Sequence, residues 1–257
     1  MIDTALELGA VLAAPLVAGL LALISHVPLG EQVLQRGIVF IDLAIAQIAA
    51  LGVLVATGTT ADAPPAWWAG TLAALLAAGF VAWLARVWPA QREALIGLVY
   101  VGGAAAAILW VSSDPHGAQK LRALLAGDIL WVRTDALLPL AIGTALFALL
   151  PALRPDALRR DRLFYPAFAA LISLSVPVLG LYLVFAMLIA PALGARRWPM
   201  PPAGIVRALP YLLGMAGLVT GLAASYRFDT PSGPTIVLAT IIVSAVSSAL
   251  SAVRLRG

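Results

Sequence analysis

Two polar side chains stand close together in an otherwise apolar stretch of the sequence. Asp42 and Gln47 lie five positions apart in the segment 41–50. A helix turns about 100° per residue, so these side chains point about 140° apart and do not form an i, i+4 pair. In apolar surroundings a carboxylate and a carboxamide could line a pathway for a polar solute. Alternatively, Asp42 caps its helix or pairs with Arg36, and Gln47 hydrogen-bonds to a neighbouring helix.

A second polar group lies in the connection 114–135. Asp128 follows Gly127, where the backbone can bend, and is a further candidate for lining a pathway. Asp114 and His116 could bind a metal ion, but two loop ligands are weak evidence, and the alternative is that both are solvated. The apolar stretch 121–125 inside this polar connection predicts a short helix packed at the mouth of the molecule.

A third polar group is the charged segment 154–162. Pro155 at a first helical position and Asp156 in the first turn are typical of a helix start. Arg159 and Arg160 follow, so the segment predicts a short basic helix. Such a helix could anchor to anionic lipid or dock onto a partner protein.

The sequence has none of the motifs that we associate with catalysis. There is no cysteine, which excludes disulfides and thiolate sites. We find no phosphate-binding GxxxxGK[ST] loop, no HExxH and no Ser-His-Asp set. We therefore expect neither an enzyme nor ATPase machinery on this chain.

The composition excludes a water-soluble protein. Of the 257 residues, 62% are hydrophobic and 11% are charged, whereas soluble domains are about 45–50% apolar and about 25% charged. Too few polar residues remain to cover a soluble globule, which excludes a soluble enzyme, a disordered protein and a nucleic-acid reader.

Stretches of sequence without a charged residue, here called windows, predict the helices that must position the polar groups described above. A membrane crossing takes roughly 20 residues. Seven windows have about this length, and the window 163–195 is too long for one crossing. Because Pro177 and Gly180 interrupt it, we expect two short spans there and nine spans in all, with eight as the alternative. The windows are 8–25, 43–61, 63–85, 94–113, 136–153, 163–195, 208–226 and 230–253.

The basic residues predict the orientation of these spans. With nine spans, one side holds only Lys120, Arg122, Arg133 and Arg227. Lys and Arg favour the cytoplasmic side, so we expect the N-terminus outside and the C-terminus in the cytoplasm. His26 is expected at the cytoplasmic interface. The other side holds Arg36, Arg86, Arg92, Arg154, Arg159, Arg160, Arg162, Arg196, Arg197, Arg207, Arg254 and Arg256.

Four stretches together resemble one family, the permease subunits of bacterial ABC importers for divalent metals (zinc, manganese and iron). The segments 93–97 and 124–132 are similar to its acidic-x-x-Ile-Gly motif and its Gly-Asp/Ser-Ile-Leu segment. Segment 180–196 looks like its Leu-Ile-x-Pro-Ala-x-x-Ala-Arg run. Segment 221–237 resembles its Ser-Tyr…Asp-x-Pro-x-Gly-x-x-Ile-Val ending. The likeness runs from about residue 29 to the C-terminus.

The resemblance implies an all-α, polytopic integral membrane protein with about nine transmembrane helices and the type II permease fold of the vitamin-B12 importer. It implies one transmembrane permease domain over residues 1–257, with a cytoplasmic coupling helix at about 154–163. In that helix Pro155, Asp156 and Ala157 match the family pattern, and Arg159 and Arg160 would join them in contacting the ATPase. No cofactor is expected on this chain.

The resemblance also implies partners and a cargo. ATP would be bound and hydrolysed on a separate cytoplasmic ATPase subunit. A periplasmic or lipid-anchored metal-binding protein would deliver a divalent metal ion, and a second permease copy would complete a homodimer in the bacterial inner membrane. Counting back from Gly52, Gln47 stands where the family commonly has His, and a carboxamide is the poorer metal ligand.

A competing hypothesis is a membrane protein that needs no ATPase, either a secondary transporter or an intramembrane enzyme. Proton-coupled carriers usually place acidic groups in mid-span. Here the windows are free of charge and the acidic residues cluster near their ends. This pattern favours the ATP-driven permease.

Overall fold

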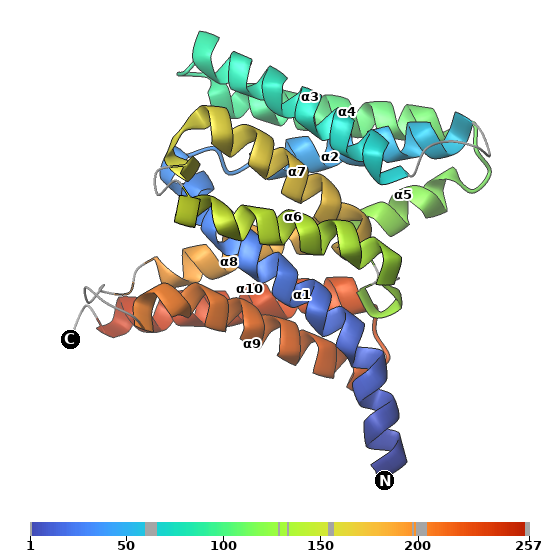
Figure 1. Ribbon diagram of the computed structural model, residues 1–257, viewed down its shortest axis with the longest axis vertical. Coiled ribbons are helices and arrows are strands. Elements are labelled where there is room, and N and C mark those ends of the chain that lie inside the picture. The colour runs from blue at the N-terminus through green and yellow to red at the C-terminus, as the bar shows by residue number, and fades with distance from the viewer. Residues whose placement is uncertain are drawn as a thin grey trace.

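The computed structural model describes residues 2–59, 66–127, 129–132, 134–153, 157–196, 198 and 205–254. Over these residues the chain forms ten α-helices and two 3-10 turns, with no strand (Figure 1). The elements are α1 (Ile2–Arg36), α2 (Ile41–Thr59), α3 (Ala66–Val87), α4 (Arg92–Val111), α5 (Gly117–Ala126), η1 (Ile129–Trp131), α6 (Thr134–Leu153), η2 (Ala157–Arg159), α7 (Asp161–Leu179), α8 (Leu181–Ala195), α9 (Ile205–Phe228) and α10 (Ser232–Arg254).

Nine of these helices correspond in position to the expected spans. Six are long and apolar enough to cross a membrane, and they belong to α1, α3, α4, α7, α9 and α10. Three shorter apolar helices, Ile41–Thr57, Ala136–Leu150 and Leu181–Ala195, correspond to the remaining windows. The tenth helix, α5, is the short helix expected within the polar connection.

The long window 163–195 divides as expected. Helix α7 ends at Leu179 and α8 begins at Leu181. Gly180 between them has φ of 80°, a left-handed conformation that a residue with a Cβ adopts at a cost. Pro177 lies inside α7 and does not end it, so the glycine makes the break.

The helices pack into two neighbouring groups. Helix α2 packs against α3, α4 and α7, while α10 packs against α8 and α9. Helix α1 crosses between them and contacts α8, α6 and α9. In Figure 1, α3 and α4 form one edge of the molecule and α9 and α10 the opposite edge. Large buried side chains such as Ile45, Phe164 and Phe168 fill the space between the helices.

Consecutive long helices run in alternating directions, so their connections fall at two opposite ends of the bundle (Figure 1). One, the η2 end, holds η2 and the C-terminal end of α10, and the other, the α5 end, holds α5 and η1. Among the described residues, basic side chains at the α5 end are Lys120, Arg122 and Arg227. Those at the η2 end are Arg36, Arg86, Arg92, Arg159, Arg160, Arg162, Arg196 and Arg254. The expected grouping of charge is present in the fold.

Candidate functional site

Asp42 is a buried carboxylate at the start of α2. Its side chain is 1% exposed, and neither carboxylate oxygen has a hydrogen-bond partner among the described residues. The turn that precedes it begins at Gly37, whose φ of 63° ends α1. Ile38 N then donates to Val33 O at 3.3 Å, the bond of a glycine-terminated helix. The local sequence therefore ends one helix and starts the next so that Asp42 enters the bundle.

Arg36 does not pair with Asp42, which excludes that alternative. Its Nε lies 3.5 Å from Asp161 Oδ1 in the first turn of α7. A buried polar group without a partner costs free energy, and an isolated charge costs far more. A carboxylate held in this way is therefore suited to receive a group that is not part of the resting protein, such as a cation in transit.

Gln47 lies one turn further along α2 and is 2% exposed. Its Cγ is 3.3 Å from the position that a Cβ would take on Gly103 of α4. The amide thus lies at the contact between α2 and α4, and no hydrogen bond joins it to Asp42. The structure brings both side chains into the interior, but it does not join them.

The third pathway candidate, Asp128, lies outside the described residues. Its chain neighbours Gly127 and Ile129 belong to the α5 end, whereas Asp42 follows Arg36 near the η2 end (Figure 1).

His26 was expected at an interface, and that prediction is wrong. The side chain is 0% exposed, and α1 continues past it to Arg36, about 15 Å further at 1.5 Å per residue. Its Nδ1 lies 3.0 Å from Ser25 Oγ, and its Nε2 has no hydrogen-bond partner among the described residues. This buried imidazole was not predicted from the sequence, because the first uncharged window, 8–25, ends just before His26.

In the described part of the predicted basic helix, residues 157–159 form a 3-10 turn and residues 161–162 already belong to the first turn of α7. Pro155 and Asp156 lie outside the described residues, and Ala157 begins the turn. Arg159 and Arg160 are exposed at the η2 end. Backbone carbonyls of this turn, those of Leu158 and Arg159, accept hydrogen bonds from Arg36. Sequence reasoning missed Arg36 in this role.

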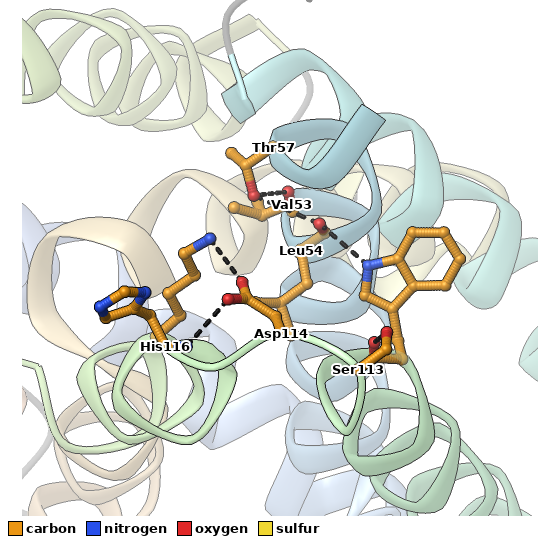
Figure 2. A network of polar contacts seen from close by, with 8 residues as sticks. Val53, Leu54, Thr57, Ser113, Asp114 and His116 are labelled. Carbon is orange, nitrogen blue, oxygen red and sulfur yellow. Dashed lines mark hydrogen bonds and ion pairs between the residues drawn. The ribbon is translucent and has the colours of Figure 1, made fainter. Parts of the chain in front are cut away.

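A polar cavity of about 400 Å³ opens at the α5 end between α2, α4 and α5. Asp114 accepts hydrogen bonds from Lys120 Nζ at 2.7 Å and from His116 N at 2.9 Å (Figure 2). The bond from Lys120 lowers the pKa of the Asp114 carboxyl. Trp110 Nε1 donates to Leu54 O across the same cavity. These groups satisfy one another, and no cluster of three potential metal ligands occurs among the described residues.

Comparison with known proteins gives a consistent result. The model of the ABC 3 transport family matches residues 8–158 and 153–251. An uncharacterized membrane protein of Synechocystis sp. is 27% identical over 260 residues, which cover 91% of this chain and 88% of the relative. The high-affinity zinc uptake system membrane protein ZnuB of Haemophilus influenzae is 24% identical over 250 residues, which cover 90% of this chain and 94% of the relative.

The fold is also similar to a solved structure. One chain of PsaBC from Streptococcus pneumoniae, solved in complex with Fab, superposes with a TM-score of 0.72. The match covers 96% of this chain and 95% of that chain at 19% identity, which is a likeness of fold.

Proposed function

Because the chain belongs to the ABC 3 transport family, we propose that it is the transmembrane permease subunit of an ATP-driven importer of divalent metal ions, zinc, manganese or iron. The family match over nearly the whole chain carries this proposal. Further support comes from the name of the ZnuB relative, which assigns that protein to zinc uptake. The cargo is a substrate and not a resident cofactor.

The ATP-dependent step belongs to a separate subunit. We propose that a cytoplasmic ATPase binds and hydrolyses ATP, and that this permease provides the path through the bacterial inner membrane. Two permease copies, a metal-binding protein outside the membrane and surrounding lipid complete the assembly, with residues 1–257 acting as one transmembrane domain. The alternating helices and the two polar ends support this arrangement.

The metal path is proposed to pass Asp42. A carboxylate oxygen binds hard and borderline cations, and few protein ligands favour release. Gln47 and Asp128 are further candidates for this path, in which Gln47 would be the weaker ligand. The observation that supports Asp42 is its burial without a hydrogen-bond partner in the part of the chain that the structure describes.

The function can be tested with the reconstituted complex. We expect Zn²⁺ or Mn²⁺ delivered by the binding protein to stimulate ATP hydrolysis and to accumulate inside proteoliposomes only when ATP is supplied. Uptake that persisted in cells depleted of ATP, but stopped when the proton gradient was collapsed, would instead identify a secondary transporter.

The orientation of the permease is a separate prediction. We propose that the η2 end faces the cytoplasm and that the N-terminus lies outside, because basic side chains gather at the η2 end. A reporter tag inserted beside residue 158 should be active only in the cytoplasm. Labelling of that tag from outside intact cells would contradict the proposed topology and the ATPase contact together.

The segment 154–163 is proposed as the coupling helix that docks onto the ATPase. Replacing Asp156, Arg159 and Arg160 together by Ala should reduce uptake by about tenfold or more, since each 1.4 kcal/mol of lost association is a factor of ten. Membrane insertion should survive, because Arg159 and Arg160 lie on the surface. Uptake assays on matched amounts of inserted protein would measure the effect, and normal uptake would remove the coupling role.

A further inference from the structure

The last residue of α1 holds the 3-10 turn η2 in place. Arg36 Nη2 donates to Leu158 O at 2.9 Å and to Arg159 O at 3.1 Å, and Nη1 donates to Gln32 Oε1 at 2.7 Å. A guanidinium presents several donors in a fixed plane, so one side chain can bind two successive carbonyls and an amide together. The end of α1 and the carbonyls of η2 are therefore joined directly.

The same guanidinium also binds the start of α7. Its Cζ lies 4.1 Å from the centre of the Phe164 ring, close enough for a cation–π contact. Its ion pair with Asp161 is longer, and the Asp161 side chain is 53% exposed, so that pair contributes little. The carbonyl bonds and the buried Phe164 ring thus carry most of the attachment.

The backbone after Arg36 is attached in turn to α4. Arg36 O accepts a hydrogen bond from Arg92 Nη2, and Phe40 N donates to Glu93 Oε1 at 3.3 Å. Residues 37–40, the α1–α2 turn, are therefore held at both ends by the first two residues of α4. Asp42 follows two residues after Phe40, in the first turn of α2.

We propose that Arg36 transmits the displacement of η2 to the α1–α2 turn and thereby to the buried Asp42. This inference rests on the proposed function, in which the ATPase moves η2. When η2 shifts, the guanidinium carries the end of α1 with it, and the start of α2 follows because only four residues separate the helices. Arg36 is a positioning residue in this scheme, since it acts on the metal path through the α1–α2 turn.

The test compares hydrolysis with transport in the full complex reconstituted into proteoliposomes, with Zn²⁺ and Mn²⁺ as separate probes. Arg36→Gln should assemble with the ATPase and hydrolyse ATP at the rate of the unmodified complex. The metal ions transported per ATP should fall by about tenfold or more, within the range of allosteric couplings. Arg36→Lys keeps the positive charge but loses the planar guanidinium group, so the number of metal ions transported per ATP should be intermediate.

Two matched variants distinguish the transmission of movement by Arg36 from the effect of its positive charge and from the effect of its ion pair with Asp161. Arg86→Gln removes an exposed positive charge from the same end of the bundle and should keep the normal ratio. Asp161→Asn removes the exposed ion pair with Arg36. Because Asp161 lies inside the proposed docking segment 154–163, the variant is compared only by the metal ions transported per ATP hydrolysed, and this ratio should change far less than in Arg36→Gln. An equal loss in Asp161→Asn and Arg36→Gln would overturn the role given to the carbonyl bonds.

A second readout follows the α1–α2 turn itself. The chain has no cysteine, so Phe40→Cys, at a side chain 47% exposed, can carry a single fluorophore. ATP should change its signal in the otherwise unmodified complex, and this change should disappear in Arg36→Gln. A signal that persisted in Arg36→Gln would overturn the inference.

The outcomes distinguish this inference from the function on which it rests. If the unmodified complex moves no metal but ATP still changes the signal at position 40 through Arg36, the proposed cargo is wrong and the link stands. If the unmodified complex moves metal and Arg36→Gln transports the normal number of metal ions per ATP, the proposed function stands and the proposed transmission through Arg36 is wrong. If Arg36→Gln fails to assemble, Arg36→Lys decides, and a parallel loss of hydrolysis and transport would reduce Arg36 to a structural role.

Discussion

Replacing Asp42 by Asn should reduce metal uptake by about tenfold or more while leaving the protein as stable as before, or more stable. The carboxylate is 1% exposed, and both oxygens lack a hydrogen-bond partner among the described residues. A buried polar group without a partner costs about 1–3 kcal/mol, whether it is the amide of Asn or the carboxyl of Asp, and any charge on the carboxyl would cost more. Asn has nearly the same shape as Asp, so the folded structure gains or is unaffected, whereas the cation loses its ligand.

This opposite behaviour of stability and activity separates a transport role from a structural one. Uptake of Zn²⁺ and Mn²⁺ by the reconstituted complex should fall by about tenfold or more, which corresponds to a loss of about 1.4 kcal/mol or more of binding free energy. Thermal unfolding of the purified permease should occur at the same or a higher temperature. Asp42→Glu keeps the carboxylate and should retain part of the uptake.

The matched control is Asp229→Asn. Asp229 is exposed and has φ of 50°, a conformation that Asn tolerates well, so this change should alter neither uptake nor unfolding. If Asp42→Asn transported normally, Asp42 would be removed from the metal path. A lowered unfolding temperature with proportionate loss of uptake would show that the carboxylate has a partner in the folded protein.

Replacing Gly180 by Ala should strongly lower the stability of the folded protein. Gly180 has φ of 80° and ψ of 155°, a conformation that is essentially restricted to glycine, so an alanine there would cost about 1–3 kcal/mol. Its Cβ would also overlap with Gly127 N, and such overpacking costs typically about 1–3 kcal/mol more. Backbone atoms of Gly127 and Ala126 form this contact, so no side chain can rotate away.

The lower stability of Gly180→Ala should be visible as a lower yield of monodisperse protein in detergent and as a lower temperature of thermal unfolding. Gly97→Ala is the matched control, because no atom lies within 4 Å of the position of its Cβ. Gly97 is inside α4, where alanine is favoured over glycine by about 1 kcal/mol. Equal behaviour of the two variants would show that the α7–α8 turn can relax.

The helices could be predicted because a bilayer leaves few choices for an apolar chain. Every backbone polar group in hydrocarbon must be satisfied within its own helix, so uncharged windows of sufficient length predict spans. The windows, the division of 163–195 and the short helix in 114–135 all appear in the fold. The grouping of basic residues at one end also follows from the order of the windows, since each span reverses the direction of the chain.

The candidate site was predicted only in part, because partners of a side chain are chosen by helix packing. Sequence spacing placed Asp42 near Arg36 and left open whether they pair. The fold pairs Arg36 with Asp161 instead, although Asp161 is far away in the sequence. The same applies to His26, whose burial depends on how far α1 extends and on its contact with α8.

The amino-acid sequence by itself determined where the apolar helices lie along the chain, where the long window breaks and at which end the basic residues gather. These features depend on length, hydropathy and backbone conformation, which act locally. Only the tertiary structure decided that Asp42 is buried with no partner among the described residues and that Arg36 binds the carbonyls of η2. The reason is that burial and hydrogen bonding depend on which helices meet, and apolar helix surfaces permit many pairings that the sequence alone does not distinguish.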